Sequence, residues 1–220
     1  MIHLDPPDFG ELRSLLAGEF EIASWDRICV LVERWDRDEL AHGVLAYITS
    51  HLERWPDRLR LAPTGWVRRK LAGVNVAQWP MVRGLSCAGM VLGHALCERI
   101  TEDLLSPKVH ILSARSAHIG YLEMQSLLDA PTVSNLTALD LTHTPLDNDT
   151  MLAIASSQKL ERLEELSLGG CKIGNDGLST LATATNLPAL KTLDLQDSRI
   201  GLFALKAMGL APFAAQLRTL

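Results

Sequence analysis

The sequence predicts an α/β fold built from a repeated strand-and-helix unit. Three observations predict it. Leucines recur with the same spacing at a fixed 27-residue step, each leucine group is followed by helical periodicity, and the composition suits a buried core. Hydrophobic residues make up 47% and charged residues 21%, close to globular averages. We expect a solenoid with parallel strands inside and helices outside, preceded by an N-terminal α-helical region.

The leucine spacing is clearest in three segments. Leu136-Thr-Ala-Leu-Asp-Leu141, Leu163-Glu-Glu-Leu-Ser-Leu168 and Leu190-Lys-Thr-Leu-Asp-Leu195 start 27 residues apart. One further step reaches Leu217. Earlier steps keep apolar residues at all three places: Val109, Leu112 and Ala114, and before them Val82, Leu85 and Cys87. We therefore predict about six units starting near residues 82, 109, 136, 163, 190 and 217, with the last unit incomplete.

Each unit reads as a short strand followed by a helix. The leucine segment alternates buried and exposed positions, as a strand does. A further apolar residue follows at Ile119, Leu146, Ile173 and Ile200. Residues 147–149 and 174–177 then predict helix starts with Asp as the cap, and Leu187-Pro188 predicts the end of the second of these helices. Neither element can bury its apolar face alone, so the units must stack.

The segment 163–173, Leu-x-x-Leu-x-Leu-x-x-Cys-x-Ile, resembles the leucine-rich-repeat family. The 27-residue period with a full helix is similar to the ribonuclease-inhibitor-like subclass. Family members often carry Asn or Cys at the ninth position. This chain has Cys171 there, but Ala117, Thr144 and Ser198 in the sister units. The resemblance covers residues 80–220 and implies a repeat solenoid over that range.

Residues 1–79 have a different character, with all five tryptophans of the chain. Ser24 is the expected cap of a helix that runs through Trp35 and buries Trp25, Ile28, Cys29, Val32 and Trp35. A second helix is expected from Asp38 to Trp55, with Leu40, Val44, Ile48 and Leu52 in line. A third opens at Pro63-Thr64, carries Trp66, Val67 and Leu71, and ends at Gly73.

Two interpretations of this helical region stay open. It is either a cap that covers the exposed end of the repeats, or a separate recognition module. The run Trp55-Pro-Asp-Arg-Leu-Arg-Leu-Ala-Pro-Thr-Gly-Trp66 is similar to bacterial, in particular myxobacterial, leucine-rich-repeat proteins, which carry a helical segment before their repeats.

Charge and cysteine content narrow the function. The net charge is −5, so no basic excess exists to neutralise phosphates, and nucleic acid is not an expected partner. No run approaches the ~20 apolar residues that span a bilayer, and no secretory signal is seen. The scattered Cys29, Cys87, Cys97 and Cys171 predict buried thiols in a reducing compartment. We expect a cytoplasmic protein without a membrane partner.

Two arrangements could carry chemistry, and in each the structural interpretation is favoured. Cys87, His94 and Cys97 could bind zinc, but structural zinc needs four ligands with tighter pairing, so core thiols are expected. His143 and Cys171 could form a nucleophile pair, but Cys171 holds the structural ninth position. We therefore predict no catalytic residue, metal or cofactor, and a protein that is not an enzyme.

The residues between the strand leucines are expected to face solvent on a concave side. Stacking places them in columns that form a small acidic patch, which is either an ordinary solvated face or a docking surface for a protein with a basic surface. The predicted partner-binding residues are Asp140, Thr142, His143, Glu165, Ser167, Thr192, Asp194, Gln196 and Asp197.

The last unit stops inside its strand, which offers a possible edge contact at Leu217, Arg218 and Leu220. Either the chain is a fragment, or a homodimer or a partner's added strand covers this edge. The predicted function is a non-catalytic protein-protein interaction module that uses the concave face, the C-terminal edge, or both. The alternative is a structural subunit or assembly factor of a larger complex; an enzyme or enzyme activator has no supporting motif.

Overall fold

The computed structural model describes residues 8–198 and 200–219, apart from the side chain of His42. The chain divides into two compact units, Met1–Gly84 and Leu85–Leu220. Mixed α/β structure, with a parallel sheet and many helices, agrees with the predicted class.

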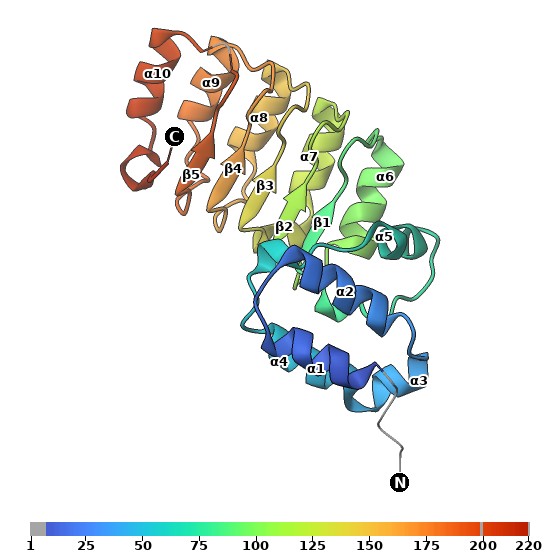
Figure 1. The fold of residues 1–220 in the computed structure, drawn as a ribbon. Coiled ribbons are helices and arrows are strands. Elements are labelled where there is room, and N and C mark those ends of the chain that lie inside the picture. Colours follow the sequence, from blue (N-terminus) through green and yellow to red (C-terminus); the bar gives the residue numbers. More distant parts are fainter. Residues whose placement is uncertain (1–7, 199, 220) are drawn as a thin grey trace. The chain divides into compact units, whose positions relative to one another are not determined.

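Helices make up most of the described part of the first unit (Figure 1). Helix α2 begins at Ile22, where Glu21 is the N-cap, so the prediction that Ser24 caps it is wrong. The predicted second helix is confirmed with shifted ends, and Asp36 and Glu39 form a capping box at its start. The elements are α1 (Phe9–Ala17), α2 (Ile22–Val32), α3 (Arg37–Glu39), the π-helix η1 (Leu40–Val44), α4 (Leu45–Leu52), η2 (Asp57–Leu59), α5 (Thr64–Leu71) and η3 (Trp79–Met81).

Helix α2 ends at Val32, earlier than predicted, yet the expected apolar face is buried through Trp35. The four residues predicted to line up in the second helix are buried as well: Leu40, Val44, Ile48 and Leu52. Helix α5 starts after Pro63 and buries Trp66 and Val67, and Gly73 adopts a φ of +75° after its end. Helix α1 was not predicted.

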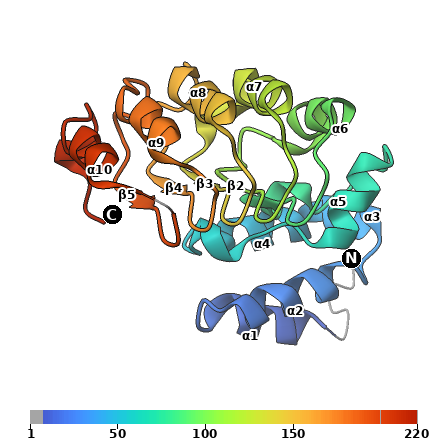
Figure 2. The same cartoon turned by 90° about the horizontal axis from the view of Figure 1, so that it is seen from above.

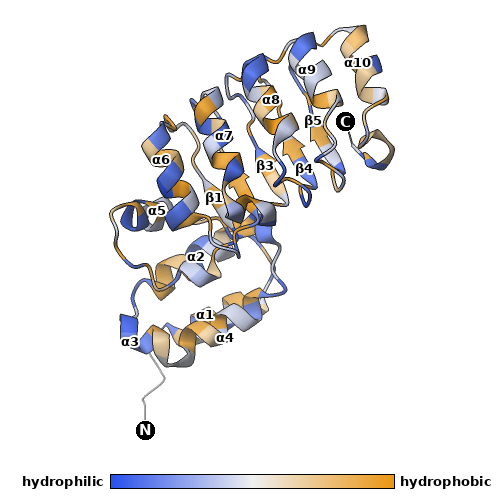
Figure 3. Ribbon diagram, turned by 180° about the vertical axis from the view of Figure 1, so that it is seen from behind, coloured by the Kyte–Doolittle hydropathy of each residue, from blue (hydrophilic) through white to orange (hydrophobic). Residues whose placement is uncertain are grey.

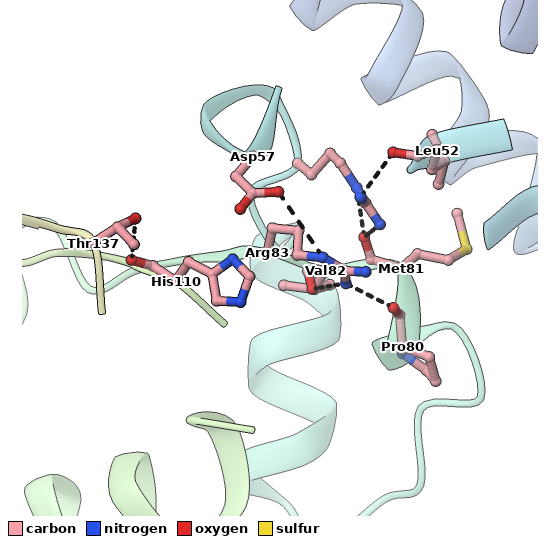
Figure 4. Close-up of polar contacts among 9 residues, drawn as sticks. Leu52, Asp57, Pro80, Met81, Val82, Arg83, His110 and Thr137 are labelled. Atoms are coloured by element: carbon pink, nitrogen blue, oxygen red, sulfur yellow. Dashed lines mark hydrogen bonds and ion pairs between the residues drawn. The ribbon is translucent and has the colours of Figure 1, made fainter. Parts of the chain in front are cut away.

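A buried arginine, Arg60, forms hydrogen bonds to two other segments of the first unit, the end of α4 and the end of η3. Arg60 is 1% exposed, and its Nε and Nη2 donate to the carbonyl oxygen of Met81 at 2.9 and 2.6 Å. Its Nη1 donates to the carbonyl oxygen of Leu52 at 2.9 Å; the two acceptor residues, Leu52 and Met81, are labelled in Figure 4. Burial lowers the pKa of the Arg60 guanidinium to about 10, which leaves it protonated at neutral pH.

The second unit repeats a strand and a helix. Figures 1 and 2 show helices α6 to α10 in a row along one side of the strands. The strands form one sheet in the order β1-β2-β3-β4-β5. They are β1 (Gly84–Ser86), at the boundary of the units, β2 (Ile111–Ser113), β3 (Ala138–Asp140), β4 (Glu165–Ser167) and β5 (Thr192–Asp194). The helices are α6 (His94–Arg99), η4 (Ile100–Leu104), α7 (Tyr121–Asp129), η5 (Pro131–Asn135), α8 (Asn148–Ser156), α9 (Asn175–Ala182), α10 (Leu202–Gly209) and η6 (Ala214–Gln216).

Strand pairing confirms the 27-residue register. Ala138 pairs in parallel with Ile111 and with Glu165, which pairs with Thr192. An isolated parallel bridge from Thr192 to Thr219 continues the same step. The leucine positions form the core, since all but two of the described ones are at most 1% exposed: Val82, Leu85, Cys87, Val109, Leu112, Ala114, Leu136, Leu139, Leu141, Leu163, Leu166, Leu168, Leu190 and Leu193. The two exceptions, Leu195 and Leu217, belong to the last units and are half-buried, and Leu220 lies outside the described residues.

After each strand the chain turns through a residue with positive φ. These residues stand at the same place in successive units: Gly89 (+69°), Ser116 (+52°), His143 (+58°), Gly170 (+65°) and Asp197 (+54°). The N–H groups of the first four extend the strand ladder; that of His143, for example, donates to the carbonyl oxygen of Gly169 at 2.7 Å. The left-handed turn is therefore part of the repeat even where no glycine occupies it.

The ninth position of each unit lies inside the turn. Thr144 Oγ1 donates to the carbonyl oxygen of Ala114 at 2.7 Å, and Cys171 Sγ donates to that of Leu141 at 3.0 Å. Both bonds reach back thirty residues and join one unit to the one before it. Ser198 Oγ is buried without a hydrogen-bond partner in the described part of the chain.

The predicted helix boundaries are partly wrong. Asp147 does cap α8, since its Oδ1 accepts from the Thr150 N–H at 2.8 Å. Helix α9 instead has Gly174 at its N-cap and no side-chain cap. It also ends at Ala182 and not at Leu187, because the following segment is held by buried Asn186, whose Nδ2 donates to the carbonyl oxygens of Ile154 and Ser157.

Candidate functional site

The parallel register gathers most of the predicted partner-binding residues on one face of the sheet, here called the strand face. Asp140, Ser167 and Asp194 stand opposite one another on β3, β4 and β5, and Ala138, Glu165 and Thr192 form a second row. Between the rows lie buried Leu139, Leu166 and Leu193. The strand face consists of residues 138, 140, 142, 143, 165, 167, 169, 170, 192, 194, 196 and 197.

Asp140 is held by its neighbours. Its Oδ1 accepts hydrogen bonds from the N–H and the hydroxyl of Thr142, at 3.0 and 2.6 Å. Its Oδ2 accepts from Ser113 Oγ at 3.2 Å and lies 3.6 Å from Arg115 Nη1. The Asp140 charge is therefore balanced locally and supports the turn after β3. Asp140 is less available to a partner than its place in the row suggests.

The other carboxylates of the strand face accept fewer hydrogen bonds than Asp140 does. Asp194 accepts one hydrogen bond, from the Gln196 N–H at 2.9 Å, and it packs beside Gly169. Glu165 and Asp197 are exposed and take part in no ion pair or hydrogen bond with a described side chain. Within the described residues, negative charge without a side-chain partner is thus concentrated at β4, β5 and the turn after β5.

Comparison with known families supports this repeat. Residues 161–182 match the family model described as a leucine-rich repeat. The chain carries a leucine-rich repeat. The matched segment contains β4 and α9, and the register shows the same step on both sides of β4. A search of curated proteins found no match for the chain. Leucine-rich repeats are in general non-catalytic interaction modules, so the match indicates a role in protein interaction.

The cysteine of the matched repeat is structural in its contacts. Cys171 is 1% exposed, and burial raises the pKa of its thiol to about 11. The thiol is therefore protonated at neutral pH and donates to the carbonyl oxygen of Leu141. The ring of His143 lies against Gly170, where a Cβ would collide with it. The geometry supports the structural interpretation of this pair.

The candidate zinc ligands are not arranged around a common point. Cys87 and Cys97 are at most 1% exposed, and burial raises the pKa of their thiols to about 12 and 11. His94 is exposed, with Nε2 3.4 Å from Glu98 on the same helix. Over residues 8–198 and 200–219, no three His, Cys, Asp or Glu side chains are grouped so that they could hold a metal ion. The helices of this part of the chain are too short or too polar to cross a membrane.

The predicted C-terminal edge is only partly accessible. The N–H of Arg218 donates to the carbonyl oxygen of Lys191 at 2.7 Å, and the N–H of Leu193 donates to that of Thr219 at 3.1 Å. The segment 217–219 thereby adds to β5 within the chain itself. Leu217 is half-buried, Arg218 is exposed, and Leu220 lies outside the described residues.

Sequence reasoning missed two features of the strand face. Arg115 stands in the same row as Thr142 and Gln196, and its charge could have been weighed against Asp140 one unit on. The left-handed turn was also missed, although Gly89 and Gly170 are three repeat steps apart and Asp197 follows at the next step. Asp and Gly at one repeat position are a sequence signal for positive φ.

Proposed function

We propose that the chain is a non-catalytic protein-protein interaction module whose strand face binds a partner with a basic surface. Residues 80–220 act as a ribonuclease-inhibitor-like solenoid in this proposal, and residues 1–79 act as its N-terminal helical cap or module. The proposal places the protein in a bacterial cytoplasm. It extends the interaction role that the matched repeat indicates.

The observation that carries the proposal is the distribution of unpaired carboxylates. Among the described residues, Glu165 and Asp197 have no side-chain partner and Asp194 accepts only from the Gln196 N–H, whereas Asp140 is balanced by Arg115. Thr142, Thr192, Gln196 and Ser167 supply hydrogen-bonding groups beside them. A basic surface would gain its charge complementarity at the C-terminal half of the strand face, where charge steers encounter and sets register.

The test uses charge reversal where it does not disturb the fold. The tagged protein is purified from its native host under gentle conditions, and the chains that co-purify are identified by mass spectrometry. The variant Glu165→Lys/Asp194→Lys is compared with Glu102→Lys/Glu161→Lys, which reverses two exposed charges outside the strand face. Asp140→Lys is kept separate because Asp140 supports the turn after β3.

We expect the strand-face variant to lose its partner and the control variant to retain it. A partner retained equally by both variants would contradict the strand face as the binding site. The affinity of the identified partner should also fall with increasing salt, because exposed charges are screened.

The alternative function, a structural subunit or assembly factor, has its own observation at the C-terminal end. A hollow of about 400 Å³ opens there, lined by Leu193, Asp194, Leu195, Gln196, Ile200, Leu205 and Thr219. Helix α10 beside it is largely hydrophobic (Figure 3), with Phe203 86% exposed, and Leu210, directly after the helix, is 87% exposed. We propose as the runner-up that a second copy of the chain, or a partner's chain, packs against this hollow and the exposed apolar side chains beside it.

Solution mass decides this alternative. Light scattering coupled to size-exclusion chromatography should show a dimer for the wild type and a monomer for Phe203→Ser/Leu210→Ser. The control is Leu122→Ser, which replaces an exposed leucine of α7. A wild-type monomer that does not change with concentration would contradict homodimerisation. A partner in fixed stoichiometry, lost in the α10 variant alone, would favour the structural-subunit function over the exchangeable module.

A further inference from the structure

The first unit contains a polar pocket that the proposed function does not use. It has a volume of about 160 Å³ and is lined by Glu33, Trp35, Arg37, Leu40, Arg69, Asn75, Ala77 and Gln78. These residues come from the end of α2, the start of α3, η1, α5 and the segment before η3. The pocket is therefore built by several elements of one compact unit.

Two guanidinium groups give the pocket N–H donors that have no hydrogen-bond partner among the described side chains. Arg37 takes part in no ion pair with a described side chain, and Arg69 Nη1 lies 3.7 Å from Glu33 Oε1, beyond hydrogen-bond distance. Glu33 is the one acid of the lining, so the lining carries more positive than negative charge. Guanidinium groups bind carboxylates through paired N–H···O bonds, which makes a small carboxylate the fitting anion.

The same pocket also has oxygen atoms that accept no hydrogen bond from a described side chain. Gln78 is 6% exposed, and its Oε1 is buried without a hydrogen-bond partner among the described residues. Its Nε2 reaches the carbonyl oxygen of Val32 at 3.4 Å. Glu33 Oε1 accepts from Trp66 Nε1 at 2.6 Å, while no described side chain donates to Glu33 Oε2. An orphaned buried acceptor is costly, and a ligand donor would satisfy it.

We propose that this pocket binds a small zwitterion with a carboxylate and an ammonium group, of which a free α-amino acid is the simplest. The carboxylate pairs with Arg37 and Arg69, and the ammonium donates toward Glu33 and Gln78. The size agrees, because a cavity of ~150 Å³ holds a molecule as large as benzene. The proposal is independent of the strand face, which belongs to the second unit.

The test measures binding of L-alanine, L-serine and L-aspartate to the full chain. Binding is detected by saturation-transfer NMR and by the rise in melting temperature that a ligand of the folded state produces. Acetate, ethylamine and inorganic phosphate are the comparison probes. We expect at least one amino acid to bind ~10-fold or more tightly than acetate or ethylamine, because each probe lacks one charged contact.

Substitutions of the lining residues test whether the amino acid binds in this pocket. Arg37→Gln/Arg69→Gln should weaken amino-acid binding by ~10-fold or more, whereas Arg68→Gln, which removes an exposed charge from the same helix, should leave it unchanged. Gln78→Met should weaken binding and change the melting temperature of the free protein little, since it removes an unsatisfied acceptor together with one long hydrogen bond of 3.4 Å. No binding of any amino acid, equal binding of phosphate or acetate, or an equal effect of Arg68→Gln would each overturn the proposal.

Discussion

The imidazole ring of His143 occupies the space in which a side chain on Gly170 would begin. The two residues hold the same place in neighbouring repeats, and both have positive φ, +58° and +65°. Glycine at 170 is therefore required by backbone conformation and also by the room that His143 takes.

Gly170→Ala should lower the free energy of unfolding by about 2–3 kcal/mol, from left-handed strain and collision with the ring. His143→Gly in the same chain should recover the collision part and relieve strain at its own position. Urea denaturation of both single variants and the double variant measures this coupling. Gly209→Ala, where a Cβ meets nothing within 4 Å, is the control. Additive effects of the two substitutions would show that the ring moves away freely.

Thr144→Val should cost about 1 kcal/mol of unfolding free energy, because the carbonyl oxygen of Ala114 loses the Thr144 hydroxyl and keeps only the Ala117 N–H, at 3.1 Å, as donor. Valine keeps the shape of threonine, so packing changes little. The matched control is Thr183→Val on the exposed surface, whose hydroxyl bonds only within its own helix turn. Equal midpoints of urea denaturation for Thr144→Val and the wild type would contradict a role in joining the units.

Arg60→Met should destabilise the chain by about 2–4 kcal/mol, and Arg60→Lys by less, because lysine keeps the charge but cannot reach both carbonyl oxygens in the same geometry. Exposed Arg58→Met should change stability by about 0.5 kcal/mol or less. Thermal and urea unfolding provide the measurement. If Arg60→Met proved neutral, the cost of burying the charge would equal the gain from its hydrogen bonds.

Asp147→Ala should lower the free energy of unfolding by about 1 kcal/mol at neutral pH through loss of the α8 cap. Hydrogen bonds from the Thr150 hydroxyl and N–H lower the pKa of Asp147 below its ordinary value. Its contribution is therefore complete above the unfolded pKa, ~3.9, and is lost as pH falls through the folded pKa.

The difference between the wild type and Asp147→Ala should accordingly shrink in acid, which urea denaturation from neutral to acidic pH measures. Asp176→Ala serves as control, since Asp176 lies in the first turn of α9 but does not cap it. A difference that stayed constant into acid would mean that the ionised cap is not its source.

The repeat register could be predicted because it depends on a strong local signal. Leu139, Leu166 and Leu193 are apolar at a fixed step, and a parallel sheet allows one register that buries all three. The ninth-position role of Cys171 followed from the resemblance to leucine-rich repeats and matches its bond to Leu141. The rows of the strand face follow from the same register.

What could not be predicted depends on contacts between distant residues. An arginine such as Arg60 is expected at the surface, and its burial follows from two carbonyl oxygens brought together by folding. The balance of Asp140 by Arg115 needs the turn geometry as well as the register. The start of α2 at Ile22 differs from the Ser24 prediction because a backbone N-cap without a side-chain bond leaves little sequence signal.

The bonds of Thr144 and Cys171 have a consequence for how the chain can change in length. Both bonds span thirty residues and end on equivalent carbonyl oxygens, so the units that start at residues 136 and 163 attach to the units before them in the same way. Excision of residues 136–162 would bring Cys171 to the carbonyl oxygen of Ala114, which Thr144 now holds, and would set Ile111 opposite Glu165. Loss of a single residue from a strand would instead turn the core leucines outward. We therefore expect this chain to tolerate the insertion or deletion of a whole repeat better than that of a single residue.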